Sequence, residues 1–362
     1  MFKAEGAQVK DQLASLGIAL PGSKTAEMGE WMYRLASSDE INLHTSAEEF
    51  INRLQAKEVS ADFLQDWNGF MKEFGARCPR EIDVATPRPH EQPALLFAQL
   101  KSMSLTIRAR RDAVPFFEEA RLKREAAYQA LDKIALQKGK SRAKAFEKEC
   151  KIWITLGGYR ETPKHYIIKV IDLFRKRVLQ VAQTFVIAGR LDVPEQIFDL
   201  TIADIDRALG DASLDLRALA KEHTLLLNKI KQCHLVARVI DSRGKIYYPP
   251  RKETAPGELA GVPISPGIVQ GRVKVFHRAN EKELLPGEIL VTRATDPGWT
   301  PLFINARGII LEIGGALQHG AVVAREYGIP CVSGLVGATD LLKDGQMVEV
   351  DGSNGVVRLL EG

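Results

Sequence analysis

The stretch Gly314-Gly315-Ala316-Leu317-Gln318-His319-Gly320-Ala321-Val322-Val323 decides the fold, and it continues as Ala324-Arg325-Glu326-Tyr327-Gly328-Ile329-Pro330. It places His319 where an apolar strand, 308–313, ends at two glycines and a helix rich in alanine and valine begins. The glycines allow a tight turn. The first amides of the helix have no partner within it, so their partial positive charge faces whatever His319 carries. A phosphate group suits this position.

We therefore interpret His319 as the carrier of a covalent phosphoryl group. A neutral imidazole is a good nucleophile near pH 7, and the transferred group needs fixed donors rather than acid chemistry. The alternative is a structural histidine that caps the helix or fills a gap, which is the commoner role of a single histidine at such a turn. The residues expected to position the phosphate are Gly314, Gly315, Gln318 and Gly320.

Composition limits the class of protein. The 362 residues have room for two or three domains, and 45% hydrophobic with 27% charged residues is typical of a globular protein. The first 22 residues lack the continuous apolar core of a signal peptide, and no apolar run is long enough to span a membrane. Four cysteines scattered singly predict a cytoplasmic protein without a metal site.

Positive charge is concentrated in the middle of the chain. Residues 101–180 contain 20 Lys and Arg but only 9 Asp and Glu. Solvated helix faces explain most of these cations, and nucleic acid is not expected because no binding module or aromatic interleaving accompanies them. A polyphosphate substrate or an acidic partner surface remains an open alternative.

The chain up to residue 240 has the pattern of an all-helical domain. Apolar residues recur at three- and four-residue spacing, and turn signals separate the segments. Helices are expected at 25–36, 47–54, 61–74, 91–100, 106–137, 164–189 and 214–239. The glycine pair at 157–158 is expected to form one of the turns.

Composition changes over 241–262, where prolines and glycines among charges predict a semi-rigid hinge linker. Short β-type runs and two helices then predict a compact β/α domain over 263–362. Strands are expected at 267–275, 288–293, 308–312, 346–351 and 356–360, and helices at 300–305 and 318–327. The predicted fold class is therefore α plus α/β, with an all-helical N-terminal domain followed by a C-terminal β/α domain.

A second candidate site is Gly157-Gly158-Tyr159-Arg160-Glu161-Thr162-Pro163-Lys164. Pro163 suits the first turn of a helix. Arg160 and Lys164 are four residues apart, so both cations can bind one anion if the helix starts nearby. The alternative is an ordinary helix start with solvated charges, and composition by itself favours it.

Two other motifs favour structural roles. The loop 75–83, Gly-Ala-Arg-Cys-Pro-Arg-Glu-Ile-Asp, is expected to be a fixed connector with a salt bridge or two. The segment Pro21-Gly22-Ser23-Lys24-Thr25 suggests a phosphate-binding P-loop, but Ser23 stands where that motif requires lysine. Gly22 and Ser23 are instead expected to end one helix and cap the next.

The segments 294–303 and 314–334 resemble the swivelling phosphohistidine domain of phosphoenolpyruvate-utilising enzymes. That group includes pyruvate phosphate dikinase, phosphoenolpyruvate synthase and rifampicin phosphotransferase. The resemblance covers 263–362 and implies a swivelling β/β/α domain phosphorylated on His319. Gln318 departs from the pattern, because dikinases and synthases have Ser, Thr or Cys there. Its amide can still donate to a phosphoryl oxygen, but it lacks their hydroxyl.

The helical part is similar to the substrate domain of rifampicin phosphotransferases at two places. One is the Arg-x-x-x-Lys pair of Arg160 and Lys164, which implies that both neutralise charge on the travelling phosphoryl group. The other is the Gly-x-Arg-x-Pro-x-Glu-Ile-Asp loop at 75–83.

The resemblance implies one module of an ATP-dependent phosphotransferase. We expect an ATP-grasp domain or subunit acting in trans to supply the phosphoryl group from ATP with Mg²⁺, because the sequence shows no nucleotide-binding motif. The acceptor is expected to be a small molecule in the helical domain, either a hydroxylated compound or pyruvate. Two alternatives stay open: a component of a phosphoenolpyruvate synthase, and a non-catalytic phosphorylation sensor or regulator.

Overall fold

The computed structural model describes residues 7–44, 46–109, 116–232, 239–247, 257–279, 281–296, 299–316 and 318–360. These residues divide into two compact units. The first unit draws on 1–81, 87–166 and 254–362, and the second on 82–86 and 167–253. The helices before residue 166 thus share a unit with the C-terminal sheet. The boundaries at 240 and 263, which were inferred from composition, stay a prediction.

Eight helices precede the second candidate site among the described residues of the first unit. Serine side chains explain three of the helix starts, because Ser23, Ser46 and Ser60 each accept a hydrogen bond from the amide three residues later. The predicted cap at Ser23 is confirmed. The helices are α1 (Ala7–Ser15), α2 (Lys24–Ser37), α3 (Asp39–Leu43), α4 (Ala47–Gln55), α5 (Ala61–Phe74), α6 (Pro93–Ala109), α7 (Phe116–Gln137) and α8 (Lys140–Gly157).

Two helix predictions need correction. The sequence predicted one helix over 106–137, whereas the structure ends α6 at Ala109 and begins α7 at Phe116, and 110–115 lie outside the described residues. Helix α8 was not predicted. Its buried residues are only Ala143, Phe146 and Cys150, a stripe too narrow to stand out among charged neighbours.

The predicted turn at Gly157-Gly158 is wrong. Both glycines have right-handed helical backbone, and α8 continues through the 3₁₀ helix η1 (Gly158–Glu161) into α9 (Thr162–Ile187). Close packing explains the glycines. A Cβ atom on Gly158 would lie 1.9 Å from the carbonyl oxygen of Pro21, and one on Gly157 would lie 2.7 Å from Cδ1 of Leu20. The glycines therefore allow residues 20 and 21 to pack closely against the helix, and they do not form a turn.

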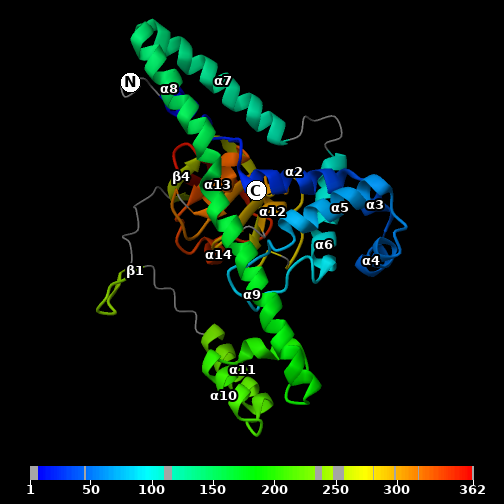
Figure 1. The fold of residues 1–362 in the computed structure, drawn as a ribbon. Coiled ribbons are helices and arrows are strands. Elements are labelled where there is room, and N and C mark those ends of the chain that lie inside the picture. Colours follow the sequence, from blue (N-terminus) through cyan, green and yellow to red (C-terminus); the bar gives the residue numbers. More distant parts are fainter. Residues whose placement is uncertain are drawn as a thin grey trace. The chain divides into compact units, whose positions relative to one another are not determined.

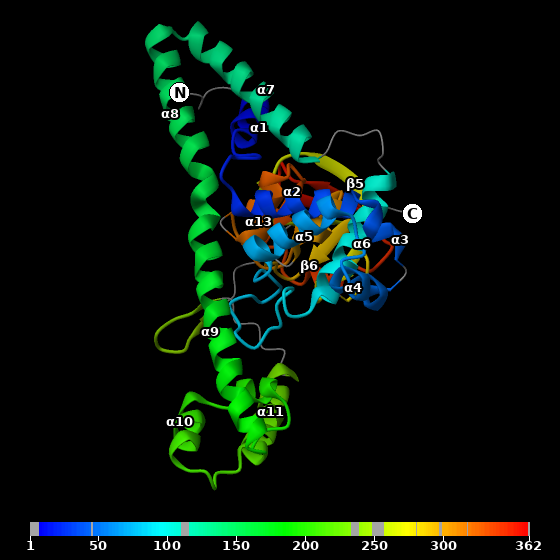
Figure 2. The ribbon, with the colours of Figure 1, turned by 45° about the vertical axis from the view of Figure 1, so that its right-hand side comes forward.

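Two groups of helices pack separately within the first unit. Helices α2, α4, α5 and α6 enclose a core of aromatic and aliphatic residues that includes Phe50, Trp67 and Phe97 (Figure 1). Helices α1, α7 and α8 pack together around Leu131 and Phe146 (Figure 2). The first group holds the residues that face the C-terminal sheet.

Within the described part of the chain, the C-terminal sheet has eight strands in the order β3-β10-β9-β5-β6-β7-β8-β4. The run β5-β6-β7-β8 is parallel, and the other pairs are antiparallel. The strands are β3 (Glu258–Ala260), β4 (Val262–Ser265), β5 (Ile268–Phe276), β6 (Ile289–Thr292), β7 (Gly308–Leu311), β8 (Cys331–Ser333), β9 (Met347–Asp351) and β10 (Val356–Leu359).

All five strands predicted for this domain are confirmed, whereas β3, β4 and β8 were not predicted. The end of the predicted hinge, 258–262, forms β3 and the start of β4. Residues 248–256 of that hinge lie outside the described residues.

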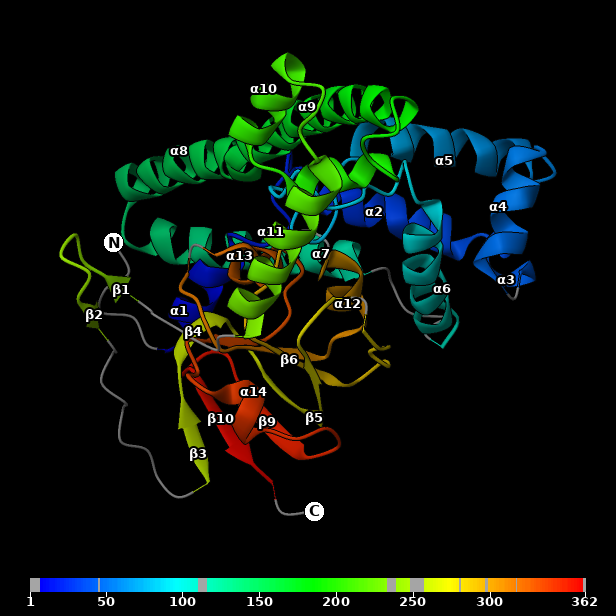
Figure 3. The same ribbon diagram turned by 90° about the horizontal axis from the view of Figure 1, so that it is seen from below.

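Helices cover both faces of the sheet. Along β7, Ile309 and Leu311 point to the core shared with α2 and α6, whereas Ile310 points to a second core on the opposite face. Helices α12 (Thr300–Asn305) and α13 (His319–Glu326) lie on the first face, and the short α14 (Ala338–Leu341) lies on the other (Figure 3). Both α12 and α13 were predicted, and both are confirmed.

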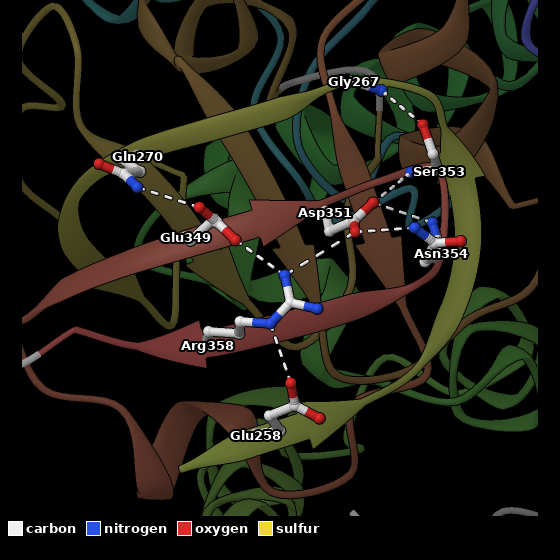
Figure 4. A network of polar contacts seen from close by, with 8 residues as sticks. All are labelled: Glu258, Gly267, Gln270, Glu349, Asp351, Ser353, Asn354 and Arg358. Atoms are coloured by element: carbon white, nitrogen blue, oxygen red, sulfur yellow. Dashed lines mark hydrogen bonds and ion pairs between the residues drawn. The ribbon is translucent and has the colours of Figure 1, made fainter. Parts of the chain in front are cut away.

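Charged side chains fix the register of the outer strands. Arg358 of β10 lies opposite Glu258 of β3 and Glu349 of β9, and its guanidinium pairs with both carboxylates at 2.9 and 2.8 Å (Figure 4). Asp351 accepts hydrogen bonds from the amides of Ser353 and Asn354 in the turn between β9 and β10. These cross-strand pairs hold β3 against the sheet.

Among its described residues, the second unit is helical apart from one short hairpin. It contains most of α9 and then η2 (Pro194–Asp199), α10 (Ile202–Gly210), α11 (Leu216–Gln232), β1 (Val239–Ile240) and β2 (Ile246–Tyr247). The helix predicted over 214–239 is thus described only to Gln232, and Val239 already belongs to a strand. Among the described residues, none of the helices combines the length and the apolar composition that crossing a membrane requires.

Candidate active site

His319 is the first residue of α13. The preceding Gln318 has extended backbone, and its carbonyl accepts the first intrahelical hydrogen bond, from the amide of Val322 at 2.9 Å. The amides of residues 319–321 therefore have no acceptor within the helix, and the helix dipole favours an anion at this end. The predicted strand, glycine turn and helix around His319 are confirmed.

The imidazole of His319 is buried and faces a carboxylate. Its side chain is 7% exposed, and Nδ1 lies 3.6 Å from Oε2 of Glu161 in η1. Among the described residues, neither ring nitrogen has a hydrogen-bond partner. Burial lowers the pKa of His319 below the usual 6.5, and Lys164 and Arg77 lower it further, whereas Glu161 raises it. The ring is therefore neutral at pH 7, as a nucleophile requires.

Glu161 is placed to select the tautomer of that ring. The pKa of Glu161 is lowered, first by its contact with His319 and then by the nearby Lys164 and Arg160. It is consequently an ionised carboxylate at neutral pH. A carboxylate facing Nδ1 favours the proton on that nitrogen, which leaves the lone pair of the imidazole on Nε2.

Lys164 and Arg77 share one buried carboxylate close to His319. Oε1 of Glu81 lies 3.2 Å from Nζ of Lys164, and Oε2 lies 2.6 Å from Nε of Arg77. Both cations act on the pKa of His319. Together with Arg160, which lies beside Glu161, three cations face the two carboxylates of Glu81 and Glu161, and this excess positive charge suits an anion beside the imidazole.

The other side of Arg77 is held by His165, the residue after Lys164. Nδ1 of His165 lies 3.4 Å from Nη1 of Arg77, and its Nε2 lies 3.2 Å from Oε1 of Glu73 in α5. Glu73 also pairs with Lys24 at the start of α2. A chain of polar contacts thus links α2, α5 and α9 and fixes the guanidinium beside the site.

The predicted phosphate-positioning glycines differ in their surroundings. Gly314 has a φ of +150°, and a Cβ atom there would lie 2.3 Å from Oε1 of Gln318. A Cβ atom on Gly320 would lie 2.2 Å from Oγ1 of Thr295. Gly315 has no described atom within 4 Å of its Cβ position, so it leaves open space. Gln318 is the N-cap of α13, but its side chain makes no capping hydrogen bond.

Arg160 lies at the exposed edge of the charged cluster. Its side chain is 43% exposed, and Nε lies 3.8 Å from Oε1 of Glu161. The structure therefore brings Lys164 and His319 into one cluster and places Arg160 beside the carboxylate that faces His319. The catalytic roles of these three residues stay predictions.

Sequence reasoning missed three residues of this cluster: Glu161, Arg77 and Glu81. Glu161 stands between the two singled-out cations but was treated as part of a helix start. Arg77 and Glu81 belong to the 75–83 loop, which was interpreted as a connector with a salt bridge. That salt bridge exists. The position of this salt bridge next to Lys164 depends on tertiary packing. The only sequence signal for it was the Gly-x-Arg-x-Pro-x-Glu-Ile-Asp motif of the loop 75–83.

Two segments of the chain match models of known domain families. Residues 2–161 match the rifampicin phosphotransferase fourth domain, and residues 284–355 match the mobile domain of PEP-utilising enzymes. His319, Glu161, Arg77 and Glu81 lie within these two segments, whereas Lys164 follows the first segment by three residues.

Curated relatives agree with these matches. The chain is 30% identical to a rifampicin phosphotransferase of Bacillus subtilis (strain 168) and 31% identical to one of a Streptomyces species, in both cases over 97% of this chain. It is 29% identical, over 88% of its length, to the prodigiosin synthesizing transferase PigC of Serratia marcescens. The chain spans 41%, 42% and 36% of the lengths of these three relatives.

Proposed function

We propose that His319 carries phosphoryl groups, because residues 2–161 match the rifampicin phosphotransferase fourth domain and residues 284–355 match the mobile domain of PEP-utilising enzymes. The similarity to rifampicin phosphotransferases over 97% of this chain supports the proposal. The proposed acceptor site lies beside Lys164 and Glu161, with Arg160 at its edge. The single observation that carries the proposal is a neutral, buried imidazole at a helix N-terminus with Nδ1 facing a carboxylate.

The geometry supports Nε2 as the nitrogen that bears the phosphoryl group. Oε2 of Glu161 occupies the Nδ1 side of the ring at 3.6 Å, and a phosphoryl dianion on that side would be repelled by it. When Nε2 attacks phosphorus, a P–N bond forms, the bond to the leaving group breaks, and the ring gains positive charge. The Glu161 carboxylate stabilises that charge through Nδ1–H.

In the second transfer, an acceptor oxygen attacks phosphorus while the P–N bond breaks and its electron pair returns to Nε2. An acceptor hydroxyl loses its proton to water as the new P–O bond forms. Negative charge spreads over the phosphoryl oxygens in the transition state, and Lys164 and Arg160 are proposed to neutralise it. Splitting the reaction at a covalent intermediate lets two separate sites use one nucleophile.

The phosphoryl donor is proposed to be ATP with Mg²⁺ at an ATP-grasp domain or subunit. The donor set beside His319 fits the anionic phosphoryl group better than the metal ion, because Lys164 and Arg77 already pair with Glu81 and cations repel Mg²⁺. When bound at the partner, ATP supplies the phosphoryl group. The residues of this chain receive it, hold it and orient it.

We propose a hydroxylated small molecule as the acceptor. The support is the identity of 30–31% over 97% of this chain to relatives named for phosphorylating rifampicin. Pyruvate, the acceptor of a synthase-type component, has no comparable support among these relatives.

Incubation with ATP, Mg²⁺ and a candidate ATP-grasp protein tests the carrier role. We expect one acid-labile phosphate per chain, located on His319 by mass spectrometry. His319→Ala should abolish the label, whereas His277→Ala, at an exposed histidine of the same sheet domain, should leave it unchanged. Label on His277, or equal labelling of the His319 variant, would show that the carrier is not His319.

A further inference from the structure

We propose that Arg77 binds the phosphoryl group on phospho-His319 and that Glu81 is the internal anion that holds Arg77 and Lys164 until this group arrives. The inference rests on the proposed function and adds to it two residues from the loop 75–83.

The guanidinium of Arg77 has one edge without a partner. Its Nε donates to Oε2 of Glu81 at 2.6 Å, and Nη1 lies 3.4 Å from Nδ1 of His165. Nη2 is fully buried and has no hydrogen-bond partner among the described residues. A buried charged donor without an acceptor is costly, and native proteins rarely retain one unless a ligand completes it. Nη2 is therefore placed to bind an anion.

The position of Arg77 identifies that anion. Arg77 and Lys164 are the cations that lower the pKa of His319, so the positive charge of both reaches the imidazole. A phosphoryl group brings about −1.5 to −2 charges at pH 7. The carboxylates of Glu81 and Glu161 balance two of the three cations Arg77, Lys164 and Arg160, which leaves one positive charge. A phosphoryl group on Nε2 would therefore add the negative charge that this cluster lacks.

Arg77 is better fixed for this role than Lys164. The Arg77 side chain is 2% exposed and is held from two sides, whereas that of Lys164 is 31% exposed and contacts Glu81 alone among the ion pairs described for it. A planar guanidinium held in this way presents N–H groups at a set angle to phosphoryl oxygens, which an ammonium group cannot do. Lys164 supplies charge, and Arg77 supplies orientation.

Arg88 provides a matched control from the same loop region. It is also fully buried, and it donates to Sγ of Cys78 at 2.8 Å and to the carbonyl oxygen of Glu81 at 2.9 Å. These contacts hold the loop itself. A variant that lacks Arg88 therefore shows how the loss of a buried arginine affects the loop when no contact to the phosphoryl group is lost.

The test loads the full chain chemically, without a partner protein. Potassium phosphoramidate transfers its phosphoryl group to imidazole: the P–N bond of the reagent breaks, a P–N bond to the ring forms, and ammonia leaves with a proton. The ³¹P signal of phospho-His319 is assigned by its loss in His319→Ala. Its chemical shift is then followed against pH to give the second pKa of the phosphoryl group.

We expect this pKa to lie below that of free phosphohistidine and to rise by about one unit in Arg77→Met, the scale of losing one close opposite charge. Glu81→Gln, which keeps the shape but frees both cations, should lower it further. Arg88→Met should leave it unchanged. A simple loop-fixing role for Arg77 would not move a phosphoryl pKa in opposite directions in the Arg77 and Glu81 variants.

The outcomes separate this inference from the proposed function. Failure of His319 to accept the phosphoryl group overturns both. A loaded His319 whose phosphoryl pKa is the same in wild type, Arg77→Met and Glu81→Gln overturns the Arg77 assignment alone. If the variants do not fold, the wild-type value decides, because a phosphoryl pKa equal to that of free phosphohistidine also overturns the assignment.

Discussion

Protonation of the His319 imidazole should make the free energy of unfolding depend on pH. Because burial lowers the pKa of His319, the unfolded chain binds a proton at this position at a higher pH than the folded chain does. The free energy of unfolding should therefore decrease as pH falls from about 6.5 through the lower folded pKa, and it should be unaffected by this group above that range. We expect NMR titration of the ring to give a pKa below 6.5 and His319→Gln to remove this part of the slope.

A folded-state pKa of 6.5 or above for His319 would contradict the buried, neutral ring. It would also remove the argument that the imidazole is ready to act as a nucleophile at neutral pH.

Glu326, at the end of α13, should show a pH dependence of the opposite sign. Burial raises its pKa to about 7, partly offset by the hydrogen bond that Ser23 donates to Oε1 at 3.0 Å. Glu161 raises the pKa further, whereas Arg325 and Arg160 lower it. Between about pH 4.5 and 7 the folded chain holds a proton that the unfolded chain has lost. The free energy of unfolding should thus fall as pH rises, by on the order of 2 kcal/mol between pH 5 and 8.

Chemical denaturation at several pH values measures this effect. Glu326→Gln should flatten the profile, and Glu283→Gln, at an exposed position, should not. An unchanged slope in Glu326→Gln would mean that another group causes it.

At the scale of residues, the sequence singled out candidate site residues whose neighbours in the chain form a recognisable local motif. His319 stands between glycines at a strand-to-helix junction, and Lys164 follows a proline in a first turn. Glu326 lies in the same quoted stretch, but its partner Ser23 is 303 residues away. Such a pair arises only from tertiary packing, and a single sequence carries no sign of it.

Among the elements, the continuous helix from α8 to α9 gives a sharp prediction at Gly158. Replacement of a helical glycine by alanine normally stabilises a helix by about 1 kcal/mol. A Cβ atom on Gly158 would instead lie 1.9 Å from the backbone oxygen of Pro21. We expect Gly158→Ala to lower the free energy of unfolding by more than about 1 kcal/mol, because a backbone atom cannot move aside as a flexible side chain can.

Gly210, at the end of α10, is the matched control, since no described atom lies within 4 Å of its Cβ position. Gly210→Ala should be neutral or stabilising in the same denaturation experiment. Equal effects of the two substitutions would mean that the contact with Pro21 does not determine the choice of glycine.

The predicted elements were correct where local sequence signals mark the helix, and wrong where tertiary packing determines the backbone conformation. Helices α5 and α12 have the predicted bounds because a capping serine or a proline marks the start and the apolar spacing is regular. The glycine pair at 157–158 was mistaken for a turn. In a sequence, two glycines that form a turn look the same as two glycines that allow another segment to pack closely. Strand β8 has three residues, too few to show a period.

In the first unit as a whole, α13 meets α2 and the segment before it through hydrogen bonds as well as through the shared hydrophobic core. The amide of Ala19 donates to the carbonyl oxygen of Glu326 at 3.0 Å, and Oη of Tyr327 donates to the carbonyl oxygen of Thr25 at 3.3 Å. Gly29 of α2 makes room for that tyrosine, because a Cβ atom there would lie 2.2 Å from Oη. If the sheet domain moves as a carrier, these contacts must break and reform.

The last prediction follows from that requirement. The Ala19 amide should exchange with deuterium faster than the amide of Val350 in the centre of the sheet, because separation of α13 from α2 does not require the sheet to unfold. Gly29→Ala should accelerate exchange at Ala19 and leave Val350 unchanged, since the new methyl group displaces Tyr327. Gly29→Ala combined with Tyr327→Phe should restore part of the protection by removing Oη, although Cζ would remain 3.1 Å from the methyl group. Equal exchange rates at Ala19 and Val350 in the wild type would mean that the contact opens only with global unfolding. A carrier domain that delivers phosphoryl groups between two sites could not work in that way.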